Sequence, residues 1–255
     1  MRFVKLLREG RGVWGVLHGD VVHTLTEPPF EGVRYDGESL PLSGCRLLAP
    51  CEATKIVCIG KNYFDHIHEM KSMLDASNTP DRPTLFLKAL NALNSHLGKV
   101  HAPDFVGRLD YEGELAVVMK RRAKDVLEEE ALDYVLGYTC LNDITARDVQ
   151  KADGQWARGK NMDGFAPMGP VVTDEVDPEH LTITTRLNGQ VVQQGRTEQL
   201  ITGVRALISF ITASMTLEPG DVIATGTPAG VGPMQPGDTV EVEVSGIGIL
   251  CNTIV

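Results

Sequence analysis

The sequence has no apolar run long enough to cross a membrane. Its longest uncharged stretch with helical spacing, Ala206–Leu217, contains 12 residues, whereas a helix that spans a bilayer needs about 20. The first twelve residues carry five charged side chains, so the apolar core of a signal peptide cannot form there. We therefore expect a cytoplasmic protein that does not associate with a membrane.

Cysteine is sparse as well. The five cysteines form no CxxC pair, and their odd number leaves at least one without a disulfide partner. Cys58 and Cys140 stand between apolar neighbours, which is typical of buried, reduced thiols. Reduced thiols favour the same cytoplasmic location.

Basic residues are fewer than acidic ones. The chain of 255 residues has 24 Lys and Arg against 34 Asp and Glu, a net charge of −10, and such a chain repels the phosphate backbone of nucleic acids. We therefore expect no nucleic-acid partner and regard a metal cation as a natural one. With 42% hydrophobic residues, the composition is that of a globular protein with a sizeable core rather than a disordered chain.

The sequence pattern changes near residue 50. Before this residue, the β-prone runs Gly12–Leu17 and Val21–Thr26 are joined by a short glycine-containing turn, which predicts a hairpin. The stretch Pro28–Pro50 is rich in Pro and Gly and is predicted to be an irregular connector. We therefore predict a small N-terminal β extension over residues 1–50 and a main domain over residues 51–255.

The main domain is predicted to be mostly β with a few helices. Asn188-Gly189 is a strong two-residue hairpin signal, and the alternation of Val and Glu over 240–244 is typical of a strand with one wet face. The expected strands are Lys55–Ile59, Pro83–Leu87, Gly113–Lys120, Leu136–Leu141, Thr182–Leu187 and Gln190–Gln194; the expected helices are Tyr63–Leu74, Leu127–Val135, Thr145–Ala152 and Glu198–Thr216; and Asp75–Pro83 is an expected loop. Short strands separated by turns favour a closed or sandwich-like sheet over a Rossmann fold, so the expected class is a mixed, β-rich α+β fold.

A pair of glutamates interrupts an otherwise apolar strand. Glu112 and Glu114 stand two residues apart in DYEGELAVV, so on a strand their side chains share one face, about 6–7 Å apart along the backbone. Two carboxylates in one partly buried space repel each other and lose solvation, which a hard divalent cation such as Mg²⁺ would offset. Asp143, at the end of a later strand, offers a third oxygen. The alternative, a solvated strand face, is the commoner explanation of a lone ExE pair.

A second candidate group is His66 and Glu69 in GKNYFDHIHE. The two side chains are three residues apart, so they share a face of the expected helix and can hydrogen-bond, whereas His68 points elsewhere. A carboxylate beside an imidazole orients the ring and raises its basicity, which makes a general base able to activate water. A solvated pair on a surface helix is at least as common, and this alternative stays open.

Two further segments bear on the chemistry. Lys160 stands among few other charges, and a partly buried lysine there would stabilise enolate or carboxylate charge, although an ordinary surface lysine is the alternative. The glycine-rich segment 224–232 has neither the spacing nor the lysine of a phosphate-binding loop, so we reject nucleotide binding. Its backbone N–H groups and a threonine hydroxyl could instead hold a small carboxylate.

Taken together, six ordered motifs resemble the fumarylacetoacetate hydrolase family over residues 55–255. They are GKNYxxHxxE at 60–69, FLK at 86–88, DYEGELAVV at 110–118, NDITARDVQ at 142–150, WxxxKxxDxxxPxGP at 156–170 and GDVIATGTPAGVG at 220–232. The N-terminal unit resembles a short extension common in bacterial members. The resemblance implies a rolled mixed β-sheet, a homodimer, and a Mg²⁺ or Mn²⁺ site formed by Glu112, Glu114 and Asp143.

The resemblance also implies roles for individual residues. The catalytic residues would be His66 and Glu69, which match a dyad on a lid over the substrate, and Lys160; the substrate-binding residues would be Lys88, Arg147, Gln150 and Thr227. After Lys88 the chain departs from the family's usual pattern, because Ala89-Leu90-Asn91 replaces a segment that often contains proline followed by Ser or Thr. This departure affects the distal substrate pocket.

We therefore expect a metal-dependent enzyme that acts on a small 2-oxo or 2,4-dioxo acid. The carboxylate and 2-oxo oxygens of the substrate would chelate the cation, and the cation and Lys160 would stabilise the enolate that forms when a bond at C3 breaks. The dyad favours C–C bond hydrolysis, as in acylpyruvates, or decarboxylation, as in oxaloacetate. The alternatives are isomerisation of 2-hydroxyhepta-2,4-diene-1,7-dioate and a ligand-binding homologue without turnover.

Overall fold

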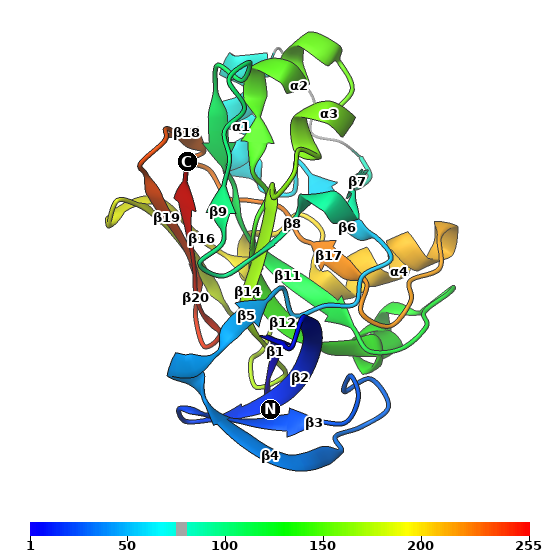
Figure 1. Ribbon diagram of the computed structural model, residues 1–255. Helices are drawn as coiled ribbons and strands as arrows, with labels where there is room; N and C mark the ends of the chain where they lie inside the picture. Colours follow the sequence, from blue (N-terminus) through cyan, green and yellow to red (C-terminus); the bar gives the residue numbers. More distant parts are fainter. Residues whose placement is uncertain (75–80) are drawn as a thin grey trace.

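The computed structural model describes residues 1–74 and 81–255. The strands that it describes form three sheets, and α1, α2 and α3 gather at one end of the molecule, at the top of Figure 1. The β-rich α+β class with an N-terminal β unit is confirmed. The loop expected over Asp75–Pro83 lies largely outside the described residues.

The largest sheet joins the N-terminal unit to the rest of the chain. Its strands run in the order β4-β3-β2-β1-β14-β12-β11-β17-β6-β7, with β5 paired to β1 and β8 paired to β14. The sheet is mixed, because β17 and β6 are parallel, as are β14 and β8, while other neighbours are antiparallel. The strands are β1 Arg2–Arg8, β2 Arg11–His18, β3 Val21–Leu25, β4 Tyr35–Pro41, β5 Arg46–Leu48, β6 Ile56–Gly60, β7 Thr84–Lys88, β8 Leu93–Ser95, β11 Gly113–Met119, β12 Val135–Asn142, β14 Ala166–Thr173 and β17 Val222–Ala224.

The N-terminal unit contains more regular structure than the sequence predicts. The hairpin of β2 and β3 is confirmed, but β4 lies inside the stretch Pro28–Pro50 that we predicted to be irregular. Most residues of β4 are exposed, so the strand lacks apolar alternation, and backbone pairing with β3 holds it at the sheet edge. Through β1 the unit continues into the main sheet, since Phe3 pairs with Val172 of β14. The division of the chain at residue 50 stays a prediction.

A second sheet runs in the order β16-β15-β19-β20-β9 and lies on the left in Figure 1. Asn188 and Gly189 have φ values of 52° and 80°, the conformation that a two-residue hairpin requires, so this hairpin is confirmed. The predicted alternation is also confirmed, because the valines of β19 are buried and their neighbours only partly so. The strands are β9 Lys99–Val100, β15 Thr182–Leu187, β16 Gln190–Arg196, β19 Thr239–Val244 and β20 Gly248–Ile254; the small third sheet contains β10 Leu109–Tyr111, β13 Thr145–Ala146 and β18 Gly232–Met234.

Three expected helices differ from the prediction. The run Glu198–Thr216 divides into a 3₁₀ turn and α4, because Thr202 N donates to Asn62 Oδ1 at 2.8 Å and this bond holds the intervening segment out of the helix. The run Leu127–Val135 is a 3₁₀ helix, and the helix expected from Thr145 begins only after β13. The helices are α1 Phe64–Leu74, α2 Arg147–Asp153, α3 Ala157–Lys160 and α4 Val204–Ser214, with 3₁₀ helices η1 Leu42–Gly44, η2 Leu90–Ala92, η3 Glu128–Tyr134 and η4 Thr197–Gln199.

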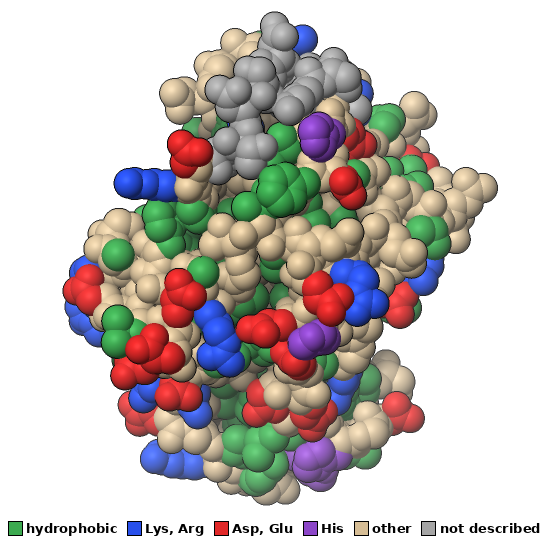
Figure 2. All heavy atoms as spheres, turned by 180° about the vertical axis from the view of Figure 1, so that it is seen from behind, with side chains coloured by type: hydrophobic (Ala, Val, Ile, Leu, Met, Phe, Trp, Pro, Cys, Tyr) green, Lys and Arg blue, Asp and Glu red, His purple; other side chains and the backbone are tan. Residues whose placement is uncertain are grey.

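The helix α4 covers part of the main hydrophobic core. The buried face of α4, with Leu207, Ile208 and Ile211, packs into the main hydrophobic core. On the face shown in Figure 2, acidic and basic side chains are interspersed rather than segregated by sign. Within residues 1–74 and 81–255, no helix has the length and apolar character that crossing a membrane requires.

Candidate metal centre and active-site pocket

Three acidic side chains meet where two central strands adjoin. β11 runs antiparallel to β12 with Gly113 opposite Asn142, so the start of β11 lies beside the end of β12. Asp143 follows directly on β12, and its backbone N–H donates to Glu112 O at 2.8 Å. Glu112 lies in the break between β10 and β11, so the two glutamates do not share one regular strand, which was the condition of the argument from their spacing. The pairing of the two strands, in addition to the two-residue spacing, therefore brings the three residues together.

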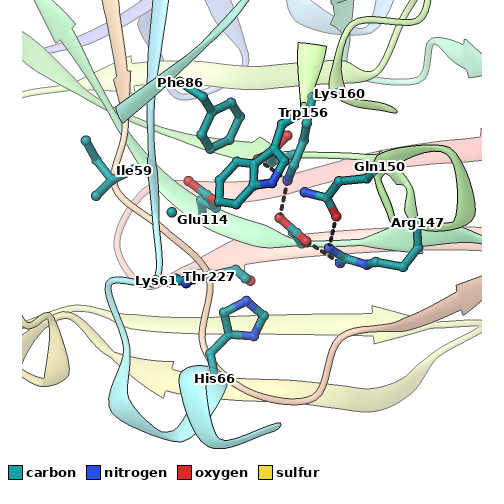
Figure 3. A pocket seen from close by; sticks show the side chains of 13 residues that line it. Ile59, Lys61, His66, Phe86, Glu114, Arg147, Gln150, Trp156, Lys160 and Thr227 are labelled. Carbon is teal, nitrogen blue, oxygen red and sulfur yellow. Dashed lines mark hydrogen bonds and ion pairs between the residues drawn. The ribbon is translucent and has the colours of Figure 1, made fainter. Parts of the chain in front are cut away.

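The carboxylates of Glu112, Glu114 and Asp143 converge. One oxygen from each lies within 4.8 Å of the others, and all three side chains are buried. They line a cavity of about 50 Å³, seen from close by in Figure 3, and this volume accommodates an ion with one or two water molecules. Carboxylate oxygens that converge in one cavity are the ligands that a divalent cation prefers.

Positive charge surrounds Glu112. Its Oε2 accepts a hydrogen bond from Lys160 Nζ at 2.7 Å, and its Oε1 is paired with Arg147. Burial would raise the pKa of Glu112, but the charges of Lys160 and Arg147 outweigh burial and hold this pKa well below its ordinary value. Glu112 is therefore ionised at neutral pH.

Glu114 has a different environment. Its Oε2 accepts a hydrogen bond from the backbone N–H of Gly226 at 2.8 Å, while the ion pairs that the described residues form in this cavity go to Glu112 and Asp143. Burial, reinforced by the negative charges of Asp143 and Glu112, raises the pKa of Glu114 well above its ordinary value. Glu114 therefore lacks the counter-charge that a bound cation would supply.

Two buried lysines bracket Asp143. Lys160 Nζ donates to Asp143 Oδ2 at 2.7 Å, and Lys88 Nζ lies 2.8 Å from Asp143 Oδ1. Lys88 also donates to the backbone oxygens of Ile144 and Lys160, so it supports Asp143 from behind the cavity. Burial would lower the pKa of Lys160, but Asp143 and Glu112 raise it above its ordinary value, and Lys160 therefore keeps its proton.

Among the four buried carboxylates around the cavity, Glu114 differs from the others. The buried cations Lys88, Arg147 and Lys160 pair with Asp110, Glu112 and Asp143, and the partly exposed Arg108 also pairs with Asp110. None of these described ion pairs involves Glu114, and a divalent cation, which prefers carboxylate oxygens, would supply positive charge there. The donor atoms, their convergence and the missing counter-charge at Glu114 fit a divalent metal site.

The helix α1 brings His66 and Glu69 to the cavity. Figure 3 shows the His66 ring pointing into the cavity, where it faces the carboxylates. His66 Nδ1 lies 3.3 Å from Glu69 Oε2, and both Glu69 carboxylate oxygens lie 3.1 Å from the backbone nitrogen of Gly230. His68 is exposed. When Nδ1 carries a proton toward Glu69, Nε2 is the ring nitrogen with a lone pair for proton transfer.

Arg147, Gln150 and Thr227 form a polar wall of the cavity. Arg147 Nη1 donates to Gln150 Oε1 at 2.8 Å, and Thr227 Oγ1 donates to Gly113 O at 2.9 Å. Gln193, a buried residue of β16 that we did not predict, donates to Thr227 Oγ1 at 2.8 Å and accepts from Gly113 N at 3.0 Å. Gln193 therefore ties Thr227 to the backbone between the two glutamates.

Two family profiles match the sequence. Residues 55–255 match the family described as fumarylacetoacetate (FAA) hydrolase C-terminal, and residues 1–50 match the one described as Rv2993c-like, N-terminal. The first match covers most of the chain and every charged residue of the cavity. This chain belongs to the fumarylacetoacetate hydrolase family. The membership that the motifs indicated is confirmed.

Similar members of the fumarylacetoacetate hydrolase family bear names for different reactions. The oxaloacetate tautomerase YisK of Bacillus subtilis is 42% identical over 226 residues, which cover 84% of this chain and 74% of YisK. The structure of 5-carboxymethyl-2-hydroxymuconate delta-isomerase from Mycobacterium smegmatis is 40% identical, with a TM-score of 0.92 over 100% of this chain and 99% of that chain. The structure of 2-hydroxyhepta-2,4-diene-1,7-dioate isomerase from Mycobacterium marinum is 41% identical, with a TM-score of 0.91 over 100% and 98%.

In this member of the fumarylacetoacetate hydrolase family, Ile59, Phe86 and Trp156 line another part of the cavity, which we name the apolar wall. The rings of Phe86 and Trp156 meet edge to face with centroids 5.1 Å apart, and Lys160 Nζ lies 5.0 Å from the Phe86 centroid. Gly60 leaves space for the indole, because a Cβ there would lie 2.6 Å from a Trp156 ring carbon. We did not predict the apolar wall, although Phe86 and Trp156 belong to motifs that carried the resemblance.

The structure gathers the predicted site residues around one cavity. Those that line it are His66, Glu112, Glu114, Asp143, Arg147, Gln150, Lys160 and Thr227. Glu69 reaches the cavity through His66, and Lys88 reaches it through Asp143. Their roles in binding and catalysis stay predictions.

Proposed function

We propose that this protein is a divalent-metal-dependent enzyme that cleaves a C–C bond, by hydrolysis or decarboxylation, in a small 2-oxo or 2,4-dioxo acid. The observation that carries the proposal is the convergence of Glu112, Glu114 and Asp143 in a cavity that also holds a protonated lysine and a His–Glu dyad. Mg²⁺ or Mn²⁺ is the proposed cation, because both prefer oxygen ligands. When bound, it would act as a Lewis acid that stabilises enolate charge.

Side chains of the cavity would bind and orient the acid. Arg147 offers planar N–H groups beside the Gln150 amide, and this pair suits a substrate carboxylate. Lys160 donates to two carboxylates and has a third N–H, which can stabilise a developing enolate oxygen. The apolar wall would pack against the carbon end of the substrate.

His66 would transfer the proton in hydrolysis. Its Nε2 takes a proton from water as the water oxygen adds to the C4 carbonyl, and Glu69 stabilises the imidazolium. The C3–C4 bond then breaks, its electron pair moves into the enolate, and the proton returns from His66 to C3. In decarboxylation no water is added, because the C3–C4 bond breaks with release of CO₂ and C3 is protonated afterwards.

Proton transfer without bond cleavage is the second candidate, and the names of the three relatives favour it. The same base can move a proton between C3 and the enol oxygen in a tautomerase, or between carbons of a conjugated chain in an isomerase. Both reactions need the enolate stabilisation described above but no nucleophilic water.

A substrate panel distinguishes the two candidates. The protein is incubated with an acylpyruvate, with oxaloacetate and with 2-hydroxyhepta-2,4-diene-1,7-dioate, each in the presence of Mg²⁺, Mn²⁺ or EDTA. Cleavage predicts metal-dependent release of pyruvate from the first two compounds, whereas tautomerisation or isomerisation changes the ultraviolet absorbance without pyruvate. If none of the three compounds turns over with either metal, the proposal is wrong.

The dyad is tested by two matched substitutions on one helix. His66→Ala should lower kcat by about 10²–10⁴-fold, the usual contribution of general acid–base catalysis. His68→Ala is the control, because His68 lies on the same helix but is exposed, and it should leave kcat unchanged. Equal activity of the two variants would remove His66 from the mechanism.

A further inference from the structure

Asp110 is a buried aspartate outside the described cavity lining that binds two arginine side chains. Asp110 is completely buried and does not belong to the described lining of the cavity. Its Oδ2 accepts a hydrogen bond from Arg147 Nε at 2.9 Å, and its Oδ1 accepts one from Arg108 Nε at 2.8 Å. Asp110 therefore binds Arg147, the one arginine that lines the described cavity, through Nε and leaves both terminal nitrogens to other partners.

The contacts of Arg147 show what this bond does. Its Nε is held by Asp110, its Nη1 donates to Gln150 and its Nη2 donates to Glu112. A guanidinium has five N–H bonds, so one remains on each terminal nitrogen. Arg147 thus touches Glu112 through a single nitrogen, and each of its terminal nitrogens keeps one N–H for another acceptor.

The backbone prepares this arrangement. Asp110 in β10 stands opposite Thr145 in β13, and Arg147 N donates to Arg108 O at 2.8 Å. The pairing of the backbones therefore holds Asp110 close to Arg147, the first residue of α2. Without an acceptor at position 110, the guanidinium would be free to form the two-point pair that arginine prefers with a carboxylate, and ionised Glu112 is its neighbour.

We propose that Asp110 is a positioning residue, which limits Arg147 to one contact with Glu112 and so keeps Glu112 oxygen lone pairs available to a divalent metal ion. The inference rests on the proposed function, since it concerns the same metal site. It adds a residue whose effect reaches the metal through Arg147.

Binding of Mn²⁺ in the absence of substrate, measured by electron paramagnetic resonance of free Mn²⁺, tests the inference. Asp110→Asn should raise the Mn²⁺ dissociation constant about 10- to 100-fold, the range typical of residues that orient a metal ligand. Asp221→Asn is the control, because Asp221 is an equally buried carboxylate that binds Thr54 and Lys55 outside the described cavity lining. It should leave the dissociation constant unchanged.

A second background separates positioning from charge. In an Arg147→Gln protein, Asp110→Asn should no longer weaken Mn²⁺ binding, because no guanidinium remains to move. An equal loss in both backgrounds would show that only the negative charge of Asp110 matters and would overturn the inference. Unchanged binding by Asp110→Asn in the native background would overturn it as well.

Folding is followed by circular dichroism for each variant. If Asp110→Asn does not fold, Asp110→Glu replaces it, since the displaced oxygens should weaken Mn²⁺ binding although the charge is kept; unchanged binding would overturn the inference. If the unsubstituted protein binds no Mn²⁺, the proposed metal site is wrong and the inference fails with it. Native binding together with unaffected variants would refute only the role of Asp110.

Discussion

Glu114→Gln should stabilise the metal-free protein and abolish its response to metal. Glu114 is buried and accepts a hydrogen bond from Gly226, but the described ion pairs of the cavity go to its acidic neighbours. A glutamine keeps an acceptor for Gly226 and places an N–H donor beside Glu112 and Asp143. The substitution therefore removes an uncompensated buried charge without leaving a void.

The expected magnitude follows from the cost of burying charge. Replacement of a buried ion pair by well-packed hydrophobic residues of similar volume is neutral or stabilises proteins by about 1–4 kcal/mol, and we expect a gain of the same order here. Each kcal/mol raises Tm by about 2–4 °C in a chain of this size. Because the pKa of Glu114 is raised in the metal-free fold by burial and by Asp143 and Glu112, its ionisation destabilises the protein as pH rises from the ordinary carboxyl pKa toward the raised one. The advantage of the variant should therefore be absent in acid and grow with pH.

Metal should offset the stability advantage of the variant. At free Mn²⁺ about 100-fold above its Kd, binding stabilises the native state by about 2.7 kcal/mol, a gain that a protein without Glu114 should lack. Thermal melting of both proteins in EDTA and in Mn²⁺, at mildly acidic and mildly alkaline pH, measures the Tm advantage of the variant, its pH dependence and the Tm shift caused by metal. A lower Tm for the variant in EDTA would refute the claim that Glu114 lacks a counter-charge in the metal-free protein. A Tm shift in Mn²⁺ as large as that of the unsubstituted protein would refute the assignment of Glu114 as a metal ligand.

Two further predictions concern packing and acid stability. Gly60→Ala should displace Trp156, because the new Cβ would lie 2.6 Å from its ring. We expect a changed tryptophan fluorescence and a raised KM, and a second substitution, Trp156→Leu, should partly restore the KM. An unchanged KM in Gly60→Ala would contradict this prediction. Burial would raise the pKa of Asp221, but hydrogen bonds from Glu218 and Lys55 lower it below its ordinary value of 3.8, so its contribution is present above that pH and is lost as pH falls through the lowered pKa. Asp221→Asn should therefore cost about 3–5 kcal/mol in urea unfolding at neutral pH and much less in acid, and equal losses at both pH values would contradict this prediction.

Much of the fold could be predicted because local pattern decides it. The Asn188-Gly189 turn and the alternating valines of β19 depend on residues that are neighbours in sequence, and both agree with the structure. β4 could not be predicted, since an exposed edge strand has no apolar alternation and is held by its partner's backbone. The start of α4 was misplaced for a similar reason, because a side chain 140 residues away, Asn62, binds the backbone of Thr202.

The acidic residues of the site could be recognised because a carboxylate within an apolar segment is costly to bury unless a partner compensates its charge. Glu112 and Glu114 were conspicuous on that ground, although spacing alone did not distinguish a metal site from a wet strand face. The ordered motifs of the family raised that interpretation, and the structure brings both carboxylates to Asp143. What spacing could not give is the asymmetry between the two glutamates, because that depends on Lys160 and Arg147 approaching only one of them.

Asp110 and Gln193 show why the remaining site residues escaped prediction. Asp110 stands in a motif that is notable for its glutamates, and Gln193 belongs to a hairpin strand whose polar residues resemble a solvated face. Each acts by occupying a donor or acceptor of a residue that was predicted, Arg147 in one case and Thr227 in the other. Residues that bind substrate are recognisable by their own chemistry, whereas residues that orient them are recognisable only once the hydrogen bonds already made by that chemistry are known. Those bonds join β10 to α2 and β16 to the glycine-rich loop, and they exist only in the folded chain.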